Sequence, residues 1–448
     1  MSAFKAYDIR GVYNKDFNKE DVYRIGFFIP QLLKTNKVLV GRDVRISSPE
    51  IFEHLVRGIN DAGADVYDLG ISTTPMVYYF TAKHNFSASV QITASHNPKE
   101  YNGLKVSRES ALPVGFDTGL GELQKLVEDK SEIIPAANRG KVLEYRVIQE
   151  YIDFQKTYLK DISNLNIAID CSNGMGALLA VDIYGTNPHY IYDELDGTFP
   201  NHEPNPLEEE NVEDLKHLVV KEKCDVGVIF DGDADRVMFV DDLGRFIRPD
   251  LMIAVLAEYF IKEKGLSGNV LQDIRTSKSV SEYITKLGCT MHMWRVGRAY
   301  AALKLREIDG IFGGELAGHY YFKDFYYSDS GILAATLILG IVADLKRKNK
   351  TFSGLINEIN TYANSGEINF KINKKAEAME AIREYFTSQE PTVAFFDFDG
   401  YRIEFKDWWF NIRPSNTEPY LRFIAEAKSE TLLAEKVAKA ESIIRKFD

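Results

Sequence analysis

Residues 226–236 read VGVIFDGDADR, in which five residues without a polar side chain run directly into three alternating aspartates. A short apolar run that ends in a polar turn is typical of a strand buried on both faces of a parallel sheet. Residues 88–103 (ASVQITASHNPKEYNG) and 310–322 (GIFGGELAGHYYF) have the same order of strand and loop. Further apolar runs of this kind lie at 37–41 (KVLVG), 166–170 (NIAID) and 269–273 (NVLQD).

Amphipathic helical patterns, such as those at 50–62 and 251–264, separate these strands. Apolar strands that alternate with helices predict α/β units, and here the pattern occurs three times. After about Gly366 the sequence changes to alternating strands around the turn Asp399-Gly400, which predicts an antiparallel α+β domain. The predicted fold is therefore three repeated mixed α/β domains and a C-terminal α+β domain. The predicted boundaries are 1–147, 148–247, 248–365 and 366–448.

Bulk properties exclude several classes of protein. The formal net charge of −12 over 448 residues argues against nucleic-acid binding, which depends on basic residues that neutralise phosphates. The longest apolar run, residues 331–343, is too short to span a bilayer, and the first residues lack a secretory signal pattern. Three well-separated cysteines are typical of a reducing compartment. We expect a cytoplasmic protein that binds neither membrane nor nucleic acid, as a monomer or weak homodimer.

The segment 93–106, TASHNPKEYNGLKV, places Ser95 just beyond a predicted buried strand. Open α/β sheets bind their ligands at this edge. A serine hydroxyl is a weak nucleophile that needs activation or prior phosphorylation, and His96, Asn97 and Lys105 supply hydrogen-bond donors around it. The alternative interpretation is a structural turn rich in Ser, Asn and Pro.

Asp231, Asp233 and Asp235 follow a predicted strand at every second position. Extended backbone alternates its side chains between two faces, so these carboxylates can converge on one point. Three like charges are unfavourable there unless a cation compensates them, and carboxylate oxygens suit Mg²⁺. Arg236 beside them can hold a phosphoryl oxygen. A solvated acidic turn is the alternative.

The glycine-rich segment GGELAGHYYF at 313–322 places Glu315 and His319 four residues apart. A carboxylate can accept hydrogen bonds from two sugar hydroxyls, and a histidine can transfer a proton. The segment RPSNTEPYLR at 413–422 offers Arg413 and several hydroxyl and amide groups to an anion. For each segment an ordinary structural loop or capped turn is the alternative.

Six motifs in order, YDIRG, GRDVR, TASHNPKEYNG, DGDADR, GGELAGH and RPSNTEP, make the full chain resemble the α-D-phosphohexomutase superfamily. The glycine-rich loop is most similar to the phosphomannomutase/phosphoglucomutase branch. The chain departs from that branch at Ala317, where a serine is usual, and at Arg298, where a histidine is usual. The resemblance implies four domains around one central cleft, to which each domain contributes a loop.

The resemblance also implies roles for single residues. Ser95 is then the phosphoserine, and one Mg²⁺ is held by Ser95, Asp231, Asp233 and Asp235. The other predicted catalytic residues are Lys105, Arg236, His319 and Arg10. The predicted substrate contacts are Tyr7, His96, Asn97, Arg275, Arg298, Glu315, Arg413, Ser415, Asn416 and Thr417.

The implied activity is a phosphohexomutase that interconverts hexose 1-phosphate and hexose 6-phosphate of mannose, glucose or both. The reaction passes through a hexose 1,6-bisphosphate, which is also the activator. The alternatives are a phosphoglucosamine mutase, a metal-dependent sugar phosphatase and a sugar-phosphate sensor. A phosphatase would release phosphate without a bisphosphate, and a sensor would not need Ser95 beside a carboxylate triad.

Overall fold

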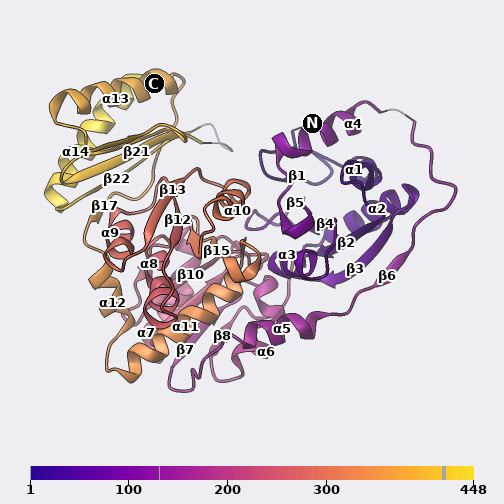
Figure 1. The fold of residues 1–448 in the computed structure, drawn as a ribbon, viewed down its shortest axis with the longest axis horizontal. Coiled ribbons are helices and arrows are strands. Elements are labelled where there is room, and N and C mark those ends of the chain that lie inside the picture. Colours follow the sequence, from indigo (N-terminus) through magenta and orange to yellow (C-terminus); the bar gives the residue numbers. More distant parts are fainter. Residues whose placement is uncertain (1, 131, 416–419, 448) are drawn as a thin grey trace.

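The computed structural model describes residues 2–130, 132–415 and 420–447 of the chain. The described residues form four β-sheets, each packed against helices, and we call the four units domains I to IV. In Figure 1, domain I lies at the right, domains II and III pack together at the centre, and domain IV lies at the upper left. The predicted fold class, three mixed α/β domains and a C-terminal α+β domain, is confirmed.

Domain I has the strand order β1-β5-β4-β2-β3-β6. Helices α1 and α2 pack closely on each other, and each buries an apolar side. The strands are β1 (Ile9–Val12), β2 (Lys37–Arg42), β3 (Asp65–Ile71), β4 (Ala88–Ile92), β5 (Tyr101–Arg108) and β6 (Val142–Glu144). The helices are α1 (Lys19–Leu32), α2 (Ser48–Asp61), α3 (Thr74–Lys83) and α4 (Leu120–Glu128).

Domains II and III have the strand orders β11-β10-β9-β7-β8 and β13-β12-β14-β15-β16. Domain II contains α5 (Ile148–Lys156), β7 (Ile167–Asp170), α6 (Ala180–Tyr184), β8 (His189–Ile191), α7 (Glu213–Glu222), β9 (Val226–Phe230), β10 (Val237–Asp241) and β11 (Phe246–Ile247). Domain III contains α8 (Leu251–Ala257), β12 (Asn269–Asp273), α9 (Lys278–Lys286), β13 (Thr290–Trp294), α10 (Arg298–Glu307), β14 (Phe312–Gly314), β15 (Tyr320–Phe322), β16 (Ser328–Asp329), α11 (Gly331–Arg347) and α12 (Phe352–Ile359).

Domain IV is an antiparallel sheet of order β17-β22-β21-β20-β19, and β18 also pairs with β22. Two helices complete this domain. Its elements are β17 (Ala363–Asn364), β18 (Ile368–Phe370), α13 (Lys375–Gln389), β19 (Ala394–Phe396), β20 (Tyr401–Glu404), β21 (Trp408–Pro414), β22 (Leu421–Ala427) and α14 (Glu430–Ile444).

The same hairpin is repeated in domains I to III. In each, the strand before the polar loop (β4, β9 or β14) pairs in parallel with one neighbour and antiparallel with the strand after the loop (β5, β10 or β15). The sheets are therefore mixed rather than parallel throughout, because the chain turns straight back after each loop. Residues 102–106, which we expected in a loop, belong to β5, where Leu104 and Val106 are buried.

Two other expectations differ in detail. The strand expected at 310–312 lies at Phe312–Gly314, so the first glycines of the GGELAGH motif are part of the sheet. The helix expected at 251–264 consists of α8 followed by a π-helical turn over Glu258–Glu263.

Helix α11 connects the cores of domains II and III. It contacts β9 and β10 of domain II as well as α8 of domain III, and nearly all of its residues are buried. This burial on every side accounts for the long apolar run at 331–343. None of the helices in the described part of the chain is both long enough and apolar enough to cross a membrane.

Candidate active site

The hydroxyl of Ser95 lies at the contact between domains I and II. Ser95 follows β4, is buried, and has a left-handed backbone conformation with φ 53°. Its Oγ donates a 3.0 Å hydrogen bond to Asp231 Oδ2, and His96 Nδ1 lies 3.3 Å from the same hydroxyl. Gly232 permits this approach, because a Cβ there would lie 2.4 Å from the Ser95 carbonyl oxygen. The structure thus brings together the predicted serine and the first predicted metal ligand.

The three aspartates of DGDADR converge, but they do so in a turn and not in the extended backbone that we expected: β9 ends at Phe230, and Ala234 has a left-handed φ of 59°. One oxygen from each of Asp231, Asp233 and Asp235 lies within 4.8 Å of the others, and all three residues are buried. Among the described residues, Asp233 Oδ1 and Asp235 Oδ1 are buried and have no hydrogen-bond partner. Buried polar atoms are rarely left without partners, so these oxygens are suited to bind a cation. Carboxylate oxygens are the donors that Mg²⁺ prefers, so the residues present fit this ion.

Two side-chain cations supply part of the charge compensation. Lys105 Nζ, on β5, lies 2.6 Å from both Asp233 Oδ2 and Asp235 Oδ2, and Arg236 Nε lies 2.9 Å from Asp231 Oδ2. Burial raises the pKa of Asp231 to about 7, although Arg236 acts in the opposite direction. The carboxylates and these two cations form one ion-pair cluster, and Asp233 Oδ1 and Asp235 Oδ1 take no part in its hydrogen bonds among the described residues.

Arg10 and Asn97 flank the serine loop on the side of β1. Arg10 Nη1 donates a 2.8 Å hydrogen bond to Asn97 Oδ1, and its Nη2 is paired with Asp8. His96 is half-buried, and desolvation together with Arg236 lowers its pKa well below the ordinary value. A neutral imidazole in contact with Ser95 Oγ can accept or donate a hydrogen bond there.

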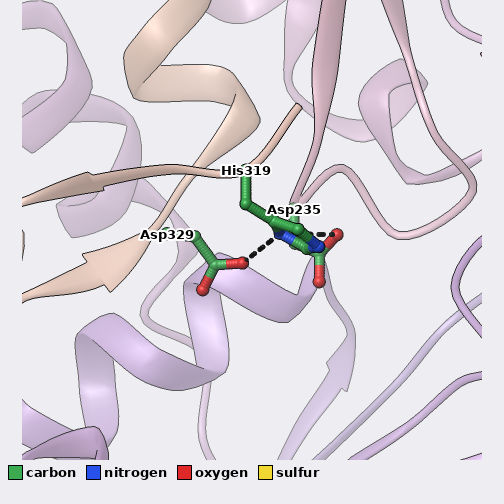
Figure 2. A group of neighbouring side chains, drawn as sticks. All are labelled: Asp235, His319 and Asp329. Atoms are coloured by element: carbon green, nitrogen blue, oxygen red, sulfur yellow. Dashed lines mark hydrogen bonds and ion pairs between the residues drawn. The ribbon is translucent and has the colours of Figure 1, made fainter. Parts of the chain in front are cut away.

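His319 lies between Asp235, in the loop after β9, and Asp329 of β16 (Figure 2). Its Nδ1 is 2.6 Å from Asp329 Oδ2 and 3.9 Å from Asp235 Oδ1. Burial opposes protonation of His319, but Asp235 and Asp329 outweigh it and raise the pKa of the imidazole. Arg298 Nε holds the other oxygen of Asp329 at 2.8 Å, and its guanidinium lies over the ring of Tyr78.

Glu315 begins the loop between β14 and β15. It is 3% exposed, and one oxygen accepts a 2.8 Å hydrogen bond from the Gly297 amide. Burial raises the pKa of Glu315 to about 7. The carbonyl of the preceding residue, Val296, accepts a 3.2 Å hydrogen bond from the hydroxyl of Tyr7 in domain I.

Arg275 and Arg413 contribute cationic groups from domains III and IV. Arg275 Nη2 is paired with Asp273 at 2.7 Å, and Glu367 lies 3.7 Å from its Nη1. Among the described residues, Arg413 Nε and Nη1 are buried without a hydrogen-bond partner, and Asp399 lies 3.7 Å from Nη1. The Ser415 amide donates to the Tyr420 carbonyl. Asn416 and Thr417 lie outside the described residues.

Comparison with known proteins identifies the family. Models described as phosphoglucomutase/phosphomannomutase alpha/beta/alpha domains I, II and III match residues 1–132, 149–244 and 248–362. The model of the C-terminal domain of the same family matches residues 367–442. The chain belongs to the phosphoglucomutase/phosphomannomutase family. The superfamily to which the sequence motifs pointed is thereby confirmed.

Individual members of the phosphoglucomutase/phosphomannomutase family match over nearly the whole chain. A phosphomannomutase from Methanocaldococcus jannaschii is 37% identical over 455 residues, which cover 100% of this chain and 98% of that protein. A phosphomannomutase from Escherichia coli is 36% identical and covers 99% of this chain and 98% of its own length. A crystal structure of a family protein from Burkholderia thailandensis has a TM-score of 0.87 at 26% identity and covers 99% of this chain and 97% of that one.

Two contacts of the site were not predicted from the sequence. Thr74, at the start of α3, donates its hydroxyl to Asp233 Oδ2 and its amide to the Asp233 carbonyl. Asp329 binds His319 and Arg298 at once. Asp329 lies just before the apolar run at 331–343, where a helix-capping residue is also expected, so the sequence alone does not indicate its contact with His319.

Proposed function

We propose that this chain interconverts hexose 1-phosphate and hexose 6-phosphate of mannose and glucose, with Ser95 as the phosphoryl carrier. Membership of the phosphoglucomutase/phosphomannomutase family makes the chain an isomerase that acts on hexose phosphates. The observation that carries the proposal is the 3.0 Å hydrogen bond between Ser95 Oγ and Asp231 inside a buried carboxylate triad. A purely structural turn has no need of a buried nucleophile beside three carboxylates.

In the proposed cycle, phosphorylated Ser95 gives its phosphoryl group to the free hydroxyl of the bound hexose phosphate. A base takes the proton of that hydroxyl as its oxygen bonds to phosphorus, the bond between phosphorus and Ser95 Oγ breaks, and Oγ takes up a proton to give the free serine. The resulting hexose 1,6-bisphosphate turns end for end, and its other phosphoryl group returns to Ser95. The same bisphosphate phosphorylates a serine that has lost its phosphoryl group, so it also acts as the activator.

Asp231, Asp233 and Asp235, together with Ser95, would hold one Mg²⁺, which when bound neutralises charge on the transferred phosphoryl group. Arg236 Nε is 2.9 Å from Asp231, which places a guanidinium beside Ser95 for a phosphoryl oxygen. Arg10 would bind a further oxygen from the side of Asn97. Preorganised cations of this kind lower the barrier because they need no reorganisation during transfer.

We assign proton transfer to Lys105 and His319. The half-buried Lys105 ammonium lies between Asp233 and Asp235, which raise its pKa well above the ordinary value, although desolvation acts in the opposite direction. His319 is held by Asp329 and lies 3.9 Å from Asp235 Oδ1, whereas Lys105 contacts the other oxygen of Asp235. A side chain that transfers a proton must lie within hydrogen-bond reach of the reacting oxygen, and both residues line the triad.

Glu315 is the proposed sugar-recognition residue, since a buried carboxylate can accept two hydroxyl groups. Arg413, whose Nε and Nη1 are buried and have no hydrogen-bond partner in the described part of the chain, is the proposed anchor for the phosphate that does not react. The remaining proposed substrate contacts are Tyr7, His96, Asn97, Arg275, Arg298, Ser415, Asn416 and Thr417. We expect the protein to act in the cytoplasm as a monomer or weak homodimer.

Replacement of the nucleophile tests the proposal. We expect Ser95→Ala to lower kcat about 10³-fold or more, because nucleophile removal is among the most costly changes in an enzyme. Intact mass should show one added phosphoryl group on the wild type, but not on the variant, after incubation with glucose 1,6-bisphosphate. Ser72→Ala, which alters another buried serine of domain I, is the matched control. Turnover by Ser95→Ala at the wild-type rate would disprove the role of Ser95, and phosphate release without isomerisation would indicate a phosphatase.

A further inference from the structure

We propose that Arg45 is the positioning residue that shapes the loop of Ser95, an inference that rests on the proposed role of Ser95. Arg45 lies in GRDVR, between β2 and α2, and is 1% exposed. Its side chain binds backbone carbonyl groups and Asp43, so its effect on the reaction would be exerted through the backbone.

The guanidinium of Arg45 binds the carbonyl oxygens along the serine loop. Its Nη2 donates to Ser95 O at 2.8 Å and to Asn97 O at 2.6 Å. Its Nη1 donates to Pro98 O at 2.7 Å and to Tyr101 O at 3.1 Å. The Nε group donates to a buried carboxylate, that of Asp43, at 3.1 Å. Arginine has five N–H donors, so each donor has an acceptor; three of the five acceptors belong to the loop, and a fourth is the carbonyl of Tyr101, the first residue of β5.

Arg45 is itself held from both domains. Asp43 accepts hydrogen bonds from the Arg45 amide at 3.0 Å and from Ser48 Oγ at 2.6 Å, which fixes the carboxylate that orients the guanidinium. From domain II, the ring of Phe199 lies 5.0 Å from the guanidinium carbon, and Gly197 pairs with Arg45 through the backbone. A side chain fixed in this way can impose a conformation on the loop that it binds.

The hydrogen bonds to Arg45 set the direction in which the peptide groups of the serine loop point. In a trans peptide the N–H of one residue points opposite to the preceding carbonyl, so the His96 N–H points away from Arg45 when the Ser95 carbonyl points toward it. Four carbonyl oxygens that would repel a phosphoryl group are thereby turned to a buried cation. The left-handed φ of 53° at Ser95 also persists only where surrounding contacts enforce it.

A purely structural role predicts a different outcome from a positioning role. A structural arginine would lower the stability of domain I and leave kcat unchanged for each folded molecule. A positioning arginine would lower kcat with little change in KM, because small misplacements of a reacting group are costly while the distant substrate contacts remain intact.

The experiment compares Arg45→Lys and Arg45→Ala with Arg24→Lys and Arg24→Ala. Arg24 is a matched control, since it also donates to two backbone carbonyls of domain I, those of Val127 and Leu126. Lysine keeps the charge but has only three donors on one atom, so it cannot serve four carbonyl groups. We expect kcat per folded molecule to fall about 100-fold in both Arg45 variants, with KM within about threefold of wild type. Millimolar guanidinium should restore part of the kcat of Arg45→Ala.

Hydrogen exchange separates this inference from the proposed function. In Arg45→Lys, exchange of the amides at 95–101 should rise, whereas in Arg24→Lys it should not. Wild-type protein without mutase activity would overturn the role of Ser95, and the exchange result would still decide whether Arg45 orders the loop. A kcat per folded molecule within about threefold of wild type, or unchanged exchange in Arg45→Lys, would overturn the positioning role.

Discussion

Asp329 and His319 are joined by a 2.6 Å contact between Oδ2 and Nδ1, at the side of the triad that faces domain III (Figure 2). Asp329 is completely buried, and its other oxygen is held by Arg298. Burial alone would raise the pKa of Asp329, but His319 and Arg298 outweigh it and lower this pKa to about 2. Asp329 therefore stays ionised, and its carboxylate favours the protonated form of the His319 imidazole.

We expect Asp329→Asn to shift the pH dependence of the reaction. Loss of the carboxylate lowers the pKa of His319, so the limb of the kcat profile that follows His319 should move to lower pH. The rate at neutral pH should fall about 10²-fold, which is the lower range for loss of a general acid or base. Asp309→Asn, which removes an exposed ion pair with Lys323, is the control and should leave the profile unchanged. An unshifted profile in Asp329→Asn would exclude His319 from proton transfer.

The second prediction concerns the metal. Chelation should abolish activity and Mg²⁺ should restore it, while the melting temperature should change little, because Lys105 and Arg236 already contact the triad. Asp233→Asn should raise the Mg²⁺ concentration required by at least about 100-fold, since loss of a group that merely orients a ligand already costs 10- to 100-fold. Titration calorimetry measures this directly.

Thr74→Val is the graded comparison for Asp233→Asn. It removes the hydroxyl that donates to Asp233 Oδ2 but leaves the carboxylate in place. The expected loss of Mg²⁺ affinity is about tenfold, the lower end of the range for orienting groups. Full activity of the wild type in excess chelator would show that the triad is structural.

The sequence predicted those parts of the site that are local in the chain. The convergence of Asp231, Asp233 and Asp235 was predicted from their spacing at every second position, but the structure brings them together in a turn with a left-handed residue at Ala234 rather than in extended backbone. Ser95 was predicted for a similar reason, since it follows a buried strand in a segment rich in hydrogen-bond donors. The domain pattern was also readable, because strand and helix periodicities differ.

Contacts between distant segments were not predictable in this way. Thr74 and Asp233 are 159 residues apart, and no spacing rule joins α3 of domain I to the loop after β9. The contacts of Arg45 in the GRDVR motif could not be predicted, because the carbonyl groups that it binds belong to a segment about 50 residues later. The antiparallel return of β5 was missed because the segment is rich in residues typical of turns.

Glu315 should lower the stability of the protein at alkaline pH. Burial raises its pKa from 4.5 in the unfolded chain to about 7 in the folded protein. Because the folded value is the higher one, the stabilisation is fully present below about pH 4.5 and is lost as the pH rises through 7. Glu315→Gln keeps an acceptor for the Gly297 amide and has no charge to bury.

Glu315→Gln should therefore be more stable than the wild type at pH 8, by up to about 3 kcal/mol, and equally stable near pH 4. Denaturant unfolding at both pH values measures the difference, and each protein serves as its own control. The same variant should lose most of its activity, since functional groups are often destabilising. A wild type that is the more stable protein at pH 8 would mean that Glu315 has a cationic partner in the folded state.

The last prediction concerns the sugar. Glu315 is expected to accept hydrogen bonds from O3 and O4, whose configurations are the same in glucose and mannose. Both hexose 1-phosphates should therefore be used, with kcat/KM values within about 100-fold of each other, because neither leaves the carboxylate unpaired. Galactose 1-phosphate inverts C4 and would leave one buried carboxylate oxygen without its hydroxyl. Sites that lose a buried partner of this kind reject the analogue by about 10⁴-fold.

Measured kcat/KM values for the three sugars decide the assignment of Glu315. Glu315→Gln serves as the comparison, because an amide keeps the shape of the side chain but offers one acceptor atom and no charge. The kcat/KM of this variant with glucose 1-phosphate should fall toward its value with galactose 1-phosphate, so that the ratio of the two values becomes smaller. The loop itself should stay in place in this variant, since the Leu316 amide remains bound to Asp273 at 2.8 Å. Comparable use of galactose 1-phosphate by the wild type would show that Glu315 does not bind O4.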